Sequence, residues 1–191
     1  MIIGLTGQTG AGKTAAAKVI EGMGAHIIDC DMAARKVTAP GAQVLDTIAR
    51  TFGESTVKDN VLDRKALGRI VFSDMEKKKQ LEDILFPLIT AYIKENIPKD
   101  GITVLDAPTL FEAGLEKMCD VTVAVTADED IRLQRLCRRD GLSPEDIAKR
   151  MASQKSRSFF EENCDYTLDN SADESSFTEA VKALFGRLLT S

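Results

Sequence analysis

The chain has 191 residues, 43% of them hydrophobic and 29% charged, which suits one well-packed core with room for insertions. Its formal net charge of −5 argues against non-specific binding of nucleic acid, and no apolar run approaches the roughly 18 residues of a membrane span. The N-terminus lacks the basic and long apolar stretches of a signal peptide, so we expect a cytoplasmic protein with no membrane and no nucleic-acid partner. The dispersed cysteines and the single histidine match neither a disulfide framework nor a structural zinc site.

The N-terminal segment predicts a strand, a helix and a second strand. Residues 1–5 form an apolar run that ends in a glycine-rich turn. Residues 13–23 place apolar side chains at helical spacing, and Gly24 can end that helix. Residues 26–28, His-Ile-Ile, predict a second strand that stops at an Asp-Cys-Asp sequence. This order indicates a parallel sheet.

The segment from about residue 40 to residue 100 has a helical pattern instead. Pro40-Gly41 breaks the chain, and two acidic residues, Asp63 and Asp74, can cap helices. We therefore predict a mostly helical insertion. Its expected helices cover residues 44–52, 64–72, 75–85 and 88–95.

The sheet pattern resumes after this insertion. Residues 102–105 predict a strand, the apolar run at 121–125 predicts one buried on both faces, and residues 166–168 predict a fifth. Helices are expected from a cap at Asp128 to Arg139, after Ser143-Pro144, and over residues 177–189. The predicted fold class is α/β, a doubly wound parallel sheet of about five strands with a helical insertion.

Residues 7–14 read Gly-Gln-Thr-Gly-Ala-Gly-Lys-Thr, the G-x-x-x-x-G-K-[ST] pattern of a phosphate-binding loop, or P-loop. Its glycines let backbone N–H groups wrap phosphate oxygens, and the helix that follows adds its positive dipole end. Lys13 can reach the β- and γ-phosphates, and the Thr14 hydroxyl can bind Mg²⁺. The motif follows a predicted strand and opens a predicted helix, the context that such a loop requires.

Two further features favour a small-molecule kinase over a GTPase switch. The chain has neither an N-K-x-D nor a D-x-x-G sequence, so the base-reading and switch motifs of GTPases are missing. Residues 132–157 hold eight Lys or Arg against three Asp or Glu, which suits a lid that closes over ATP. Arg135 and Arg139 lie four residues apart and so share a helix face, although a solvated helix face is the usual alternative for such charges.

The Asp29-Cys30-Asp31 sequence ends the second predicted strand, where ligands of open α/β sheets bind. A carboxylate there can accept the proton of an attacking hydroxyl, orient that hydroxyl, or bind Mg²⁺ through water. The alternative is a helix cap plus a solvated acid. Asp106 ends the third predicted strand of the sheet and can also hold Mg²⁺ through water.

Along nearly its whole length the sequence resembles the dephospho-CoA kinase family. The resemblance rests on the P-loop, on Asp29-Cys30-Asp31 followed by Ala34-Arg35, on Leu62-Asp63-Arg64, and on the segment 108–112, Pro-Thr-Leu-Phe-Glu. Arg135, Arg139, Gln154 and, late in the chain, Asp165 with Asn170 fit further family positions. The chain departs from the usual pattern at Gln8, Phe86, Arg132 and Cys164, where the family usually has glycine, histidine, glutamine and alanine.

The resemblance implies transfer of the γ-phosphate of ATP, with Mg²⁺, to the ribose 3′-hydroxyl of dephospho-CoA. The implied catalytic residues are Asp31, Lys13 and Arg139, and the implied metal ligands are Thr14 and Asp106. The implied nucleotide-binding residues are Gly7, Thr9, Gly10, Ala11, Gly12, Lys13, Thr14, Ala15, Arg135, Arg139 and Asn170. The acceptor would contact Asp31, Arg64, Pro108, Leu110 and Glu112, although Arg64 could equally cap its own helix and Leu110 could lie in the core.

We expect one P-loop kinase unit over residues 1–191, monomeric or in a small homo-oligomer. Its core would comprise 1–39, 101–130 and 159–191, with an acceptor-binding insertion at 40–100 and a lid at 131–158. The alternatives are another small-metabolite or nucleoside-monophosphate kinase, and an ATP-binding module without transfer activity.

Overall fold

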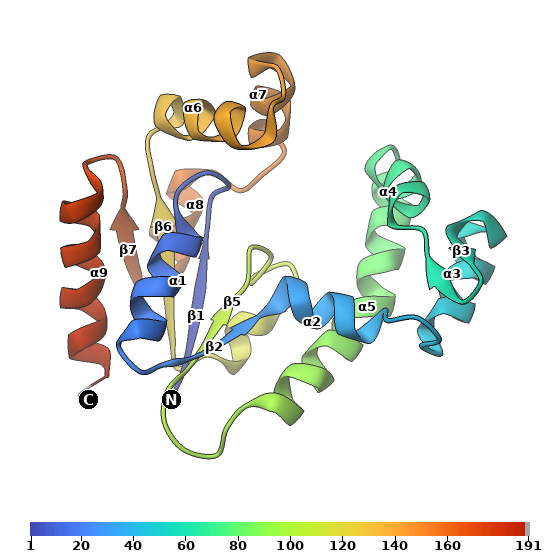
Figure 1. Ribbon diagram of the computed structural model, residues 1–191, viewed down its shortest axis with the longest axis horizontal. Coiled ribbons are helices and arrows are strands. Elements are labelled where there is room, and N and C mark those ends of the chain that lie inside the picture. The colour runs from blue at the N-terminus through green and yellow to red at the C-terminus, as the bar shows by residue number, and fades with distance from the viewer. Residues whose placement is uncertain (190–191) are drawn as a thin grey trace. The chain divides into compact units, whose positions relative to one another are not determined.

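The computed structural model describes residues 1–189 and divides into two compact units (Figure 1). The first unit comprises Met1–Ile28 and the chain from Pro98 onward, and the second comprises Asp29–Ile97. This division places the Asp29–Asp31 sequence in the second unit. The functional division into core, acceptor-binding insertion and lid stays a prediction.

A five-stranded sheet forms the centre of the first unit, in the order β2-β5-β1-β6-β7. β1 pairs in parallel with both β5 and β6, and β6 pairs in parallel with β7. The strands are β1 (Ile2–Gly7), β2 (His26–Asp29), β5 (Thr103–Asp106), β6 (Val121–Thr126) and β7 (Tyr166–Asp169). The predicted five-stranded, mostly parallel sheet is therefore confirmed.

Helices lie on both faces of this sheet in Figure 1, with α1 in front and α8 behind. The helices of the first unit are α1 (Lys13–Gly22), η2 (Leu115–Met118, a 3-10 helix), α6 (Glu129–Asp140), α7 (Pro144–Ala152), α8 (Arg157–Asn163) and α9 (Glu174–Leu188). Ser143 caps α7 as predicted, because its hydroxyl accepts a hydrogen bond from the Asp146 N–H. Asp128 is the N-cap of α6 but makes no capping bond, since its carboxylate accepts a hydrogen bond from Arg157 instead.

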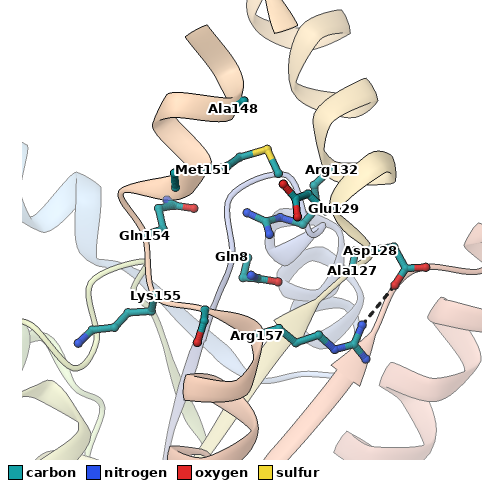
Figure 2. A pocket seen from close by; sticks show the side chains of 12 residues that line it. Gln8, Ala127, Asp128, Glu129, Arg132, Ala148, Met151, Gln154, Lys155 and Arg157 are labelled. Carbon is teal, nitrogen blue, oxygen red and sulfur yellow. Dashed lines mark hydrogen bonds and ion pairs between the residues drawn. The ribbon is translucent and has the colours of Figure 1, made fainter. Parts of the chain in front are cut away.

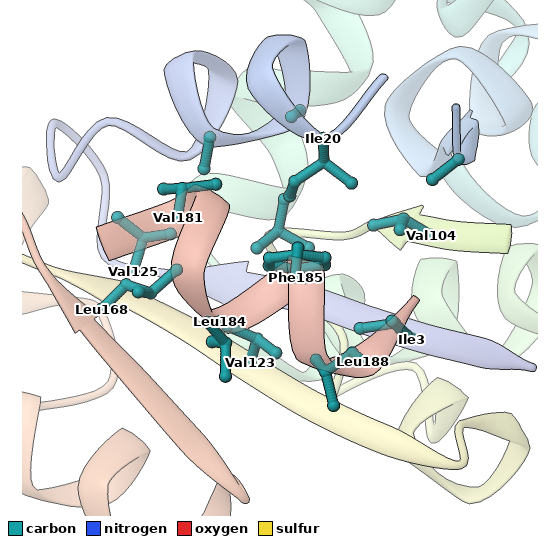
Figure 3. Packing of buried hydrophobic residues seen from close by; sticks show 14 of the residues in the cluster. Ile3, Ile20, Val104, Val123, Val125, Leu168, Val181, Leu184, Phe185 and Leu188 are labelled. Atoms are coloured by element: carbon teal, nitrogen blue, oxygen red, sulfur yellow. The ribbon is translucent and has the colours of Figure 1, made fainter. Parts of the chain in front are cut away.

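The main core lies between the sheet and the helices α1 and α9. Phe185 of α9 is fully buried there, with Ile20 of α1 and Val104 of β5 close by in Figure 3. A fully buried side chain of this size stabilises the fold by roughly 1.5–3 kcal/mol relative to an exposed one. Because β1 and β6 are buried along nearly all of their length, this core holds the loops at their carboxyl ends in place.

The second unit is mostly helical, as the sequence predicted. Its elements are α2 (Cys30–Val37), α3 (Val44–Phe52), η1 (Glu54–Thr56), β3 (Val57–Lys58), β4 (Val61–Leu62), α4 (Arg64–Phe72) and α5 (Met75–Asn96). Asp63 and Asp74 cap α4 and α5 by accepting hydrogen bonds from backbone N–H groups of the first turn. The hairpin of β3 and β4 was not predicted; its turn residues, Asp59 and Asn60, both have positive φ.

The prediction of two helices over 75–85 and 88–95 was wrong, because α5 continues through Pro87. A proline inside a helix removes one backbone hydrogen bond and usually kinks or ends the helix. In α5, hydrophobic packing stabilises the helix on both sides of Pro87. Leu81, Ile84 and Leu85 pack against the core of α3 and α4, and Ile89 and Ile93 are buried further along.

Candidate active site

The P-loop connects β1 to α1 in the first unit, as its motif predicted. Gly7 has a φ of 140°, and a Cβ on it would lie 2.1 Å from the Val125 carbonyl oxygen of β6. Gly12 has a φ of 104° and is the N-cap of α1. Both positions therefore need glycine, one for its close approach to β6 and both for their backbone conformation.

The helix after the loop presents the two motif side chains that carry chemistry. Lys13 and Thr14 form the first turn of α1, where backbone N–H groups have no partner within the helix and the helix dipole is positive. Lys13 forms an ion pair with Asp106 at the end of β5, and both side chains are about 15% exposed. The parallel pairing of β1 with β5 explains this contact, because it brings the carboxyl ends of the two strands together.

Asn170 holds the loop from the other side. It follows β7, is 6% exposed, and donates a hydrogen bond of 2.7 Å from Nδ2 to the buried carbonyl of Ala11. Its own backbone N–H bonds to the Thr126 carbonyl. Asn170 thus positions the P-loop, and a Cβ on Gly12 would lie 2.1 Å from its Nδ2.

Two side chains from the segment 131–158 bond to the backbone of Thr9 at the tip of the loop. Arg132 of α6 donates from Nε to the Thr9 carbonyl at 2.9 Å, and Gln154 accepts from the Thr9 N–H at 3.1 Å. The sequence indicated Gln154 only through the family resemblance and gave Arg132 no role. The signal for Arg132 was its position three residues before Arg135, which places both on one helix face.

The basic residues of this segment differ in what they contact. Arg139 is paired with Asp140, which also accepts a hydrogen bond from Arg150. The hydrogen bonds that Arg139 donates to Asp140 raise the pKa of Arg139 and lower the pKa of Asp140. Arg135 differs, because its Nη1 is buried without a hydrogen-bond partner among residues 1–189.

The remaining residues of the first unit lie after β5. Pro108 and Glu112 are exposed, whereas Leu110 is fully buried against Gly4, where a Cβ would lie 2.8 Å from its Cδ2. Leu110 therefore packs in the core.

In the second unit, Asp29 caps α2 by accepting a hydrogen bond of 2.9 Å from the Met32 N–H. Asp31 lies in the first turn of the same helix and is exposed. Arg64 donates from Nη2 to the Thr38 hydroxyl at 2.7 Å, so its guanidinium contacts the C-cap residue of α2. The roles of Asp31 and Arg64 stay predictions.

The chain matches the family model of dephospho-CoA kinase over residues 1–175. The chain belongs to the dephospho-CoA kinase family. A relative from Shouchella clausii named dephospho-CoA kinase is 37% identical over 191 residues, which cover 96% of this chain and 97% of the relative. The predicted family, a class of ATP-dependent transferases that phosphorylate a hydroxyl group, is confirmed.

Solved structures agree with this family assignment. The structure of TT1252 from Thermus thermophilus matches with a TM-score of 0.84 and 30% identity, covering 98% of this chain and 97% of that one. The dephospho-CoA kinase from Campylobacter jejuni matches with a TM-score of 0.71 and 26% identity, covering 99% and 97%. The predicted P-loop kinase fold is therefore confirmed.

The geometry of the site also bears on Mg²⁺. Within residues 1–189 no three His, Cys, Asp or Glu side chains cluster as a metal site. A kinase magnesium ion does not need such a cluster, because it keeps several waters and takes one or two protein oxygens plus phosphate oxygens. The Thr14 hydroxyl and the Asp106 carboxylate, both in the first unit, fit that requirement. No helix of the described part is long and apolar enough to cross a bilayer.

Proposed function

We propose that this chain transfers the γ-phosphate of ATP to the ribose 3′-hydroxyl of dephospho-CoA, giving CoA and ADP. Family membership supports dephospho-CoA as the phosphoryl acceptor. The P-loop that precedes α1 supports ATP as the phosphoryl donor. The observation that carries the proposal is the match of the family model to residues 1–175, which include the whole motif. We further propose that the enzyme acts in the cytoplasm as a monomer or small homo-oligomer and binds no nucleic acid.

The P-loop binds the phosphates of ATP in this proposal. The backbone N–H groups of the loop and of the α1 first turn donate to phosphate oxygens, and the helix dipole favours their negative charge. Lys13 exchanges its carboxylate partner Asp106 for the β- and γ-phosphates. Arg135 and Arg139 stabilise the charge that develops on the transferring phosphoryl group.

The Thr14 hydroxyl would hold Mg²⁺ directly, and the Asp106 carboxylate would hold it through water. When bound, the ion neutralises the β- and γ-phosphate oxygens. Asp106 pairs with Lys13 in this structure, and its carboxylate would be available to water ligands of the ion once Lys13 has turned to the phosphates.

The transfer itself needs a group that accepts the hydroxyl proton. The 3′-oxygen attacks the γ-phosphorus, the bond from that phosphorus to the β–γ bridging oxygen breaks, and ADP leaves. The hydroxyl proton passes to the Asp31 carboxylate. Arg64, Pro108 and Glu112 contribute to binding of the acceptor.

A coupled assay of ADP release tests this proposal with ATP, Mg²⁺ and dephospho-CoA. We expect acceptor-dependent release that Lys13→Ala abolishes. Lys18→Ala is the matched control, since Lys18 lies on the same helix and is exposed. If release depends instead on shikimate or a nucleoside monophosphate, the acceptor is wrong. Tight ATP binding without transfer to any acceptor would favour a regulatory module.

Asp31→Asn tests the proton acceptor. Because general-base catalysis typically contributes about 10²–10⁴-fold, kcat should fall by that order while ATP binding stays nearly unchanged. Asp46→Asn is the matched control, since Asp46 is also an exposed acid in the first turn of a helix of the second unit. Near-normal turnover of Asp31→Asn would remove Asp31 from the mechanism.

A further inference from the structure

A cavity of about 410 Å³ lies beside the P-loop within the first unit. Its walls come from the loop, the start of α6, the end of α7 and the turn into α8. Figure 2 shows the guanidinium of Arg132 and the amides of Gln8 and Gln154 directed toward this space, whereas Lys155 extends away from it.

Arg132 is the buried cation of this cavity. Its side chain is 5% exposed, its Nε bonds to the Thr9 carbonyl, and its Nη2 is buried with no hydrogen-bond partner in the part of the chain that is described. Burial lowers the pKa of Arg132, with the nearby Glu129 acting in the opposite direction. A guanidinium that gives up water without a full set of partners is costly, so its free nitrogen calls for a water, an ion or a ligand that accepts a hydrogen bond.

Gln8 makes the cavity polar on a second wall. It is 7% exposed, and its Oε1 is also buried without a partner among residues 1–189. An apolar occupant would leave both Gln8 and Arg132 unsatisfied. The cavity therefore fits a polar ligand that can accept a hydrogen bond from Arg132.

The bond between Arg132 and Thr9 indicates which ligand that is. It fixes the guanidinium to the loop whose sequence motif is that of a phosphate-binding loop. An arginine holds two acceptors in a fixed fork geometry, so Nε can keep the loop while Nη2 binds a phosphate oxygen.

We propose that Arg132 is a further nucleotide-binding residue, whose Nη2 donates to an oxygen of the β- or γ-phosphate while its Nε remains bonded to Thr9. Gln8 and Gln154 line the same cavity and keep it polar. This inference rests on the proposed function in one respect, that the P-loop binds a nucleoside triphosphate.

Calorimetric titration of the full chain with AMP, ADP and the β,γ-imido analogue of ATP, each with Mg²⁺, tests the proposal. Arg132→Met should weaken binding of the ATP analogue roughly tenfold or more, because a hydrogen bond to a charged group is lost, and should leave AMP binding almost unchanged. Arg132→Lys should give an intermediate loss, since an ammonium lacks the fork that serves Thr9 and phosphate together. Arg138→Met is the matched control on the exposed side of α6 and should bind all three nucleotides normally.

Thermal unfolding of each variant separates binding from folding. If Arg132→Met does not fold, Arg132→Gln keeps a donor for the Thr9 carbonyl and replaces it in the titrations. Unchanged affinity for ADP and the ATP analogue in a folded variant would overturn the proposal. An equal loss for AMP and the analogue would also overturn it, because it would indicate a purely structural role. If the unmodified chain binds no nucleotide, the proposed function fails and this inference fails with it.

Discussion

Replacing Asn170 by alanine should destabilise the P-loop, which Asn170 contacts from the loop after β7. The mutation removes the 2.7 Å hydrogen bond from Nδ2 to the Ala11 carbonyl, and Ala11 is fully buried. A buried acceptor left without its partner costs about 1–3 kcal/mol. We therefore expect the free energy of unfolding to fall by about 2 kcal/mol, equivalent to a Tm loss of roughly 4–8 °C for a chain of this size.

The measurement is urea unfolding followed by circular dichroism, with and without ATP. Because the Ala11 carbonyl that loses its partner belongs to the P-loop, the affinity for ATP should fall together with the free energy of unfolding. Asn163→Ala is the matched control, since Asn163 donates the same kind of bond to the Phe159 carbonyl at 2.8 Å in an exposed position. That control should cost less than about 0.5 kcal/mol. Equal losses for Asn170→Ala and Asn163→Ala would refute the reasoning from burial.

Two other substitutions have outcomes with a defined sign. Gly12→Ala should lower the free energy of unfolding by more than Gly24→Ala does. Both glycines have φ near +100°, but only a Cβ at Gly12 would meet Asn170. Equal losses in chemical denaturation would show that this contact does not affect stability. Hydrogen bonds from the backbone N–H and hydroxyl of Thr122 lower the pKa of Asp165 from its ordinary value of 3.8, so the charged form is favoured in the folded state. Asp165→Asn should therefore cost about 1 kcal/mol above pH 5, discounted for the exposure of Asp165, and the difference from the unmodified chain should shrink as the pH falls below 4. A difference that stays constant in unfolding curves down to pH 3 would contradict this origin.

Local patterns predicted the parts of the fold that local forces decide. The ends of α3 and α4 were predicted residue for residue, since apolar spacing marks both helices and the Asp63 cap marks the start of α4. Pro87 misled the prediction because proline opposes helix locally, whereas packing on both sides of it overrides that preference. The β3–β4 hairpin was missed although its Asp59-Asn60 turn resembles the two-residue turns typical of hairpins.

The candidate site also has parts that a local motif predicted and parts that only tertiary structure brings together. The P-loop could be predicted from the sequence because its contiguous motif determines both the loop and the start of α1. The pairing of Lys13 with Asp106 follows from the order of the strands, which a sequence expresses only indirectly. The departures at Gln8 and Arg132 were unrelated in the sequence and line one cavity in the fold, so their relation required tertiary structure.

The basic segment 132–157 shows why charge alone does not identify phosphate-binding residues. Spacing selected Arg135 and Arg139 together, yet their surroundings differ. Arg139 is exposed and paired with Asp140, so it must exchange that partner before it can bind phosphate. Arg132 and Arg135 each have a buried guanidinium nitrogen without a partner within residues 1–189, so a phosphate oxygen would satisfy them without breaking any ion pair. Since breaking a pair offsets part of what a new one contributes, the buried and unpaired arginines should dominate the nucleotide affinity and Arg139 should contribute less.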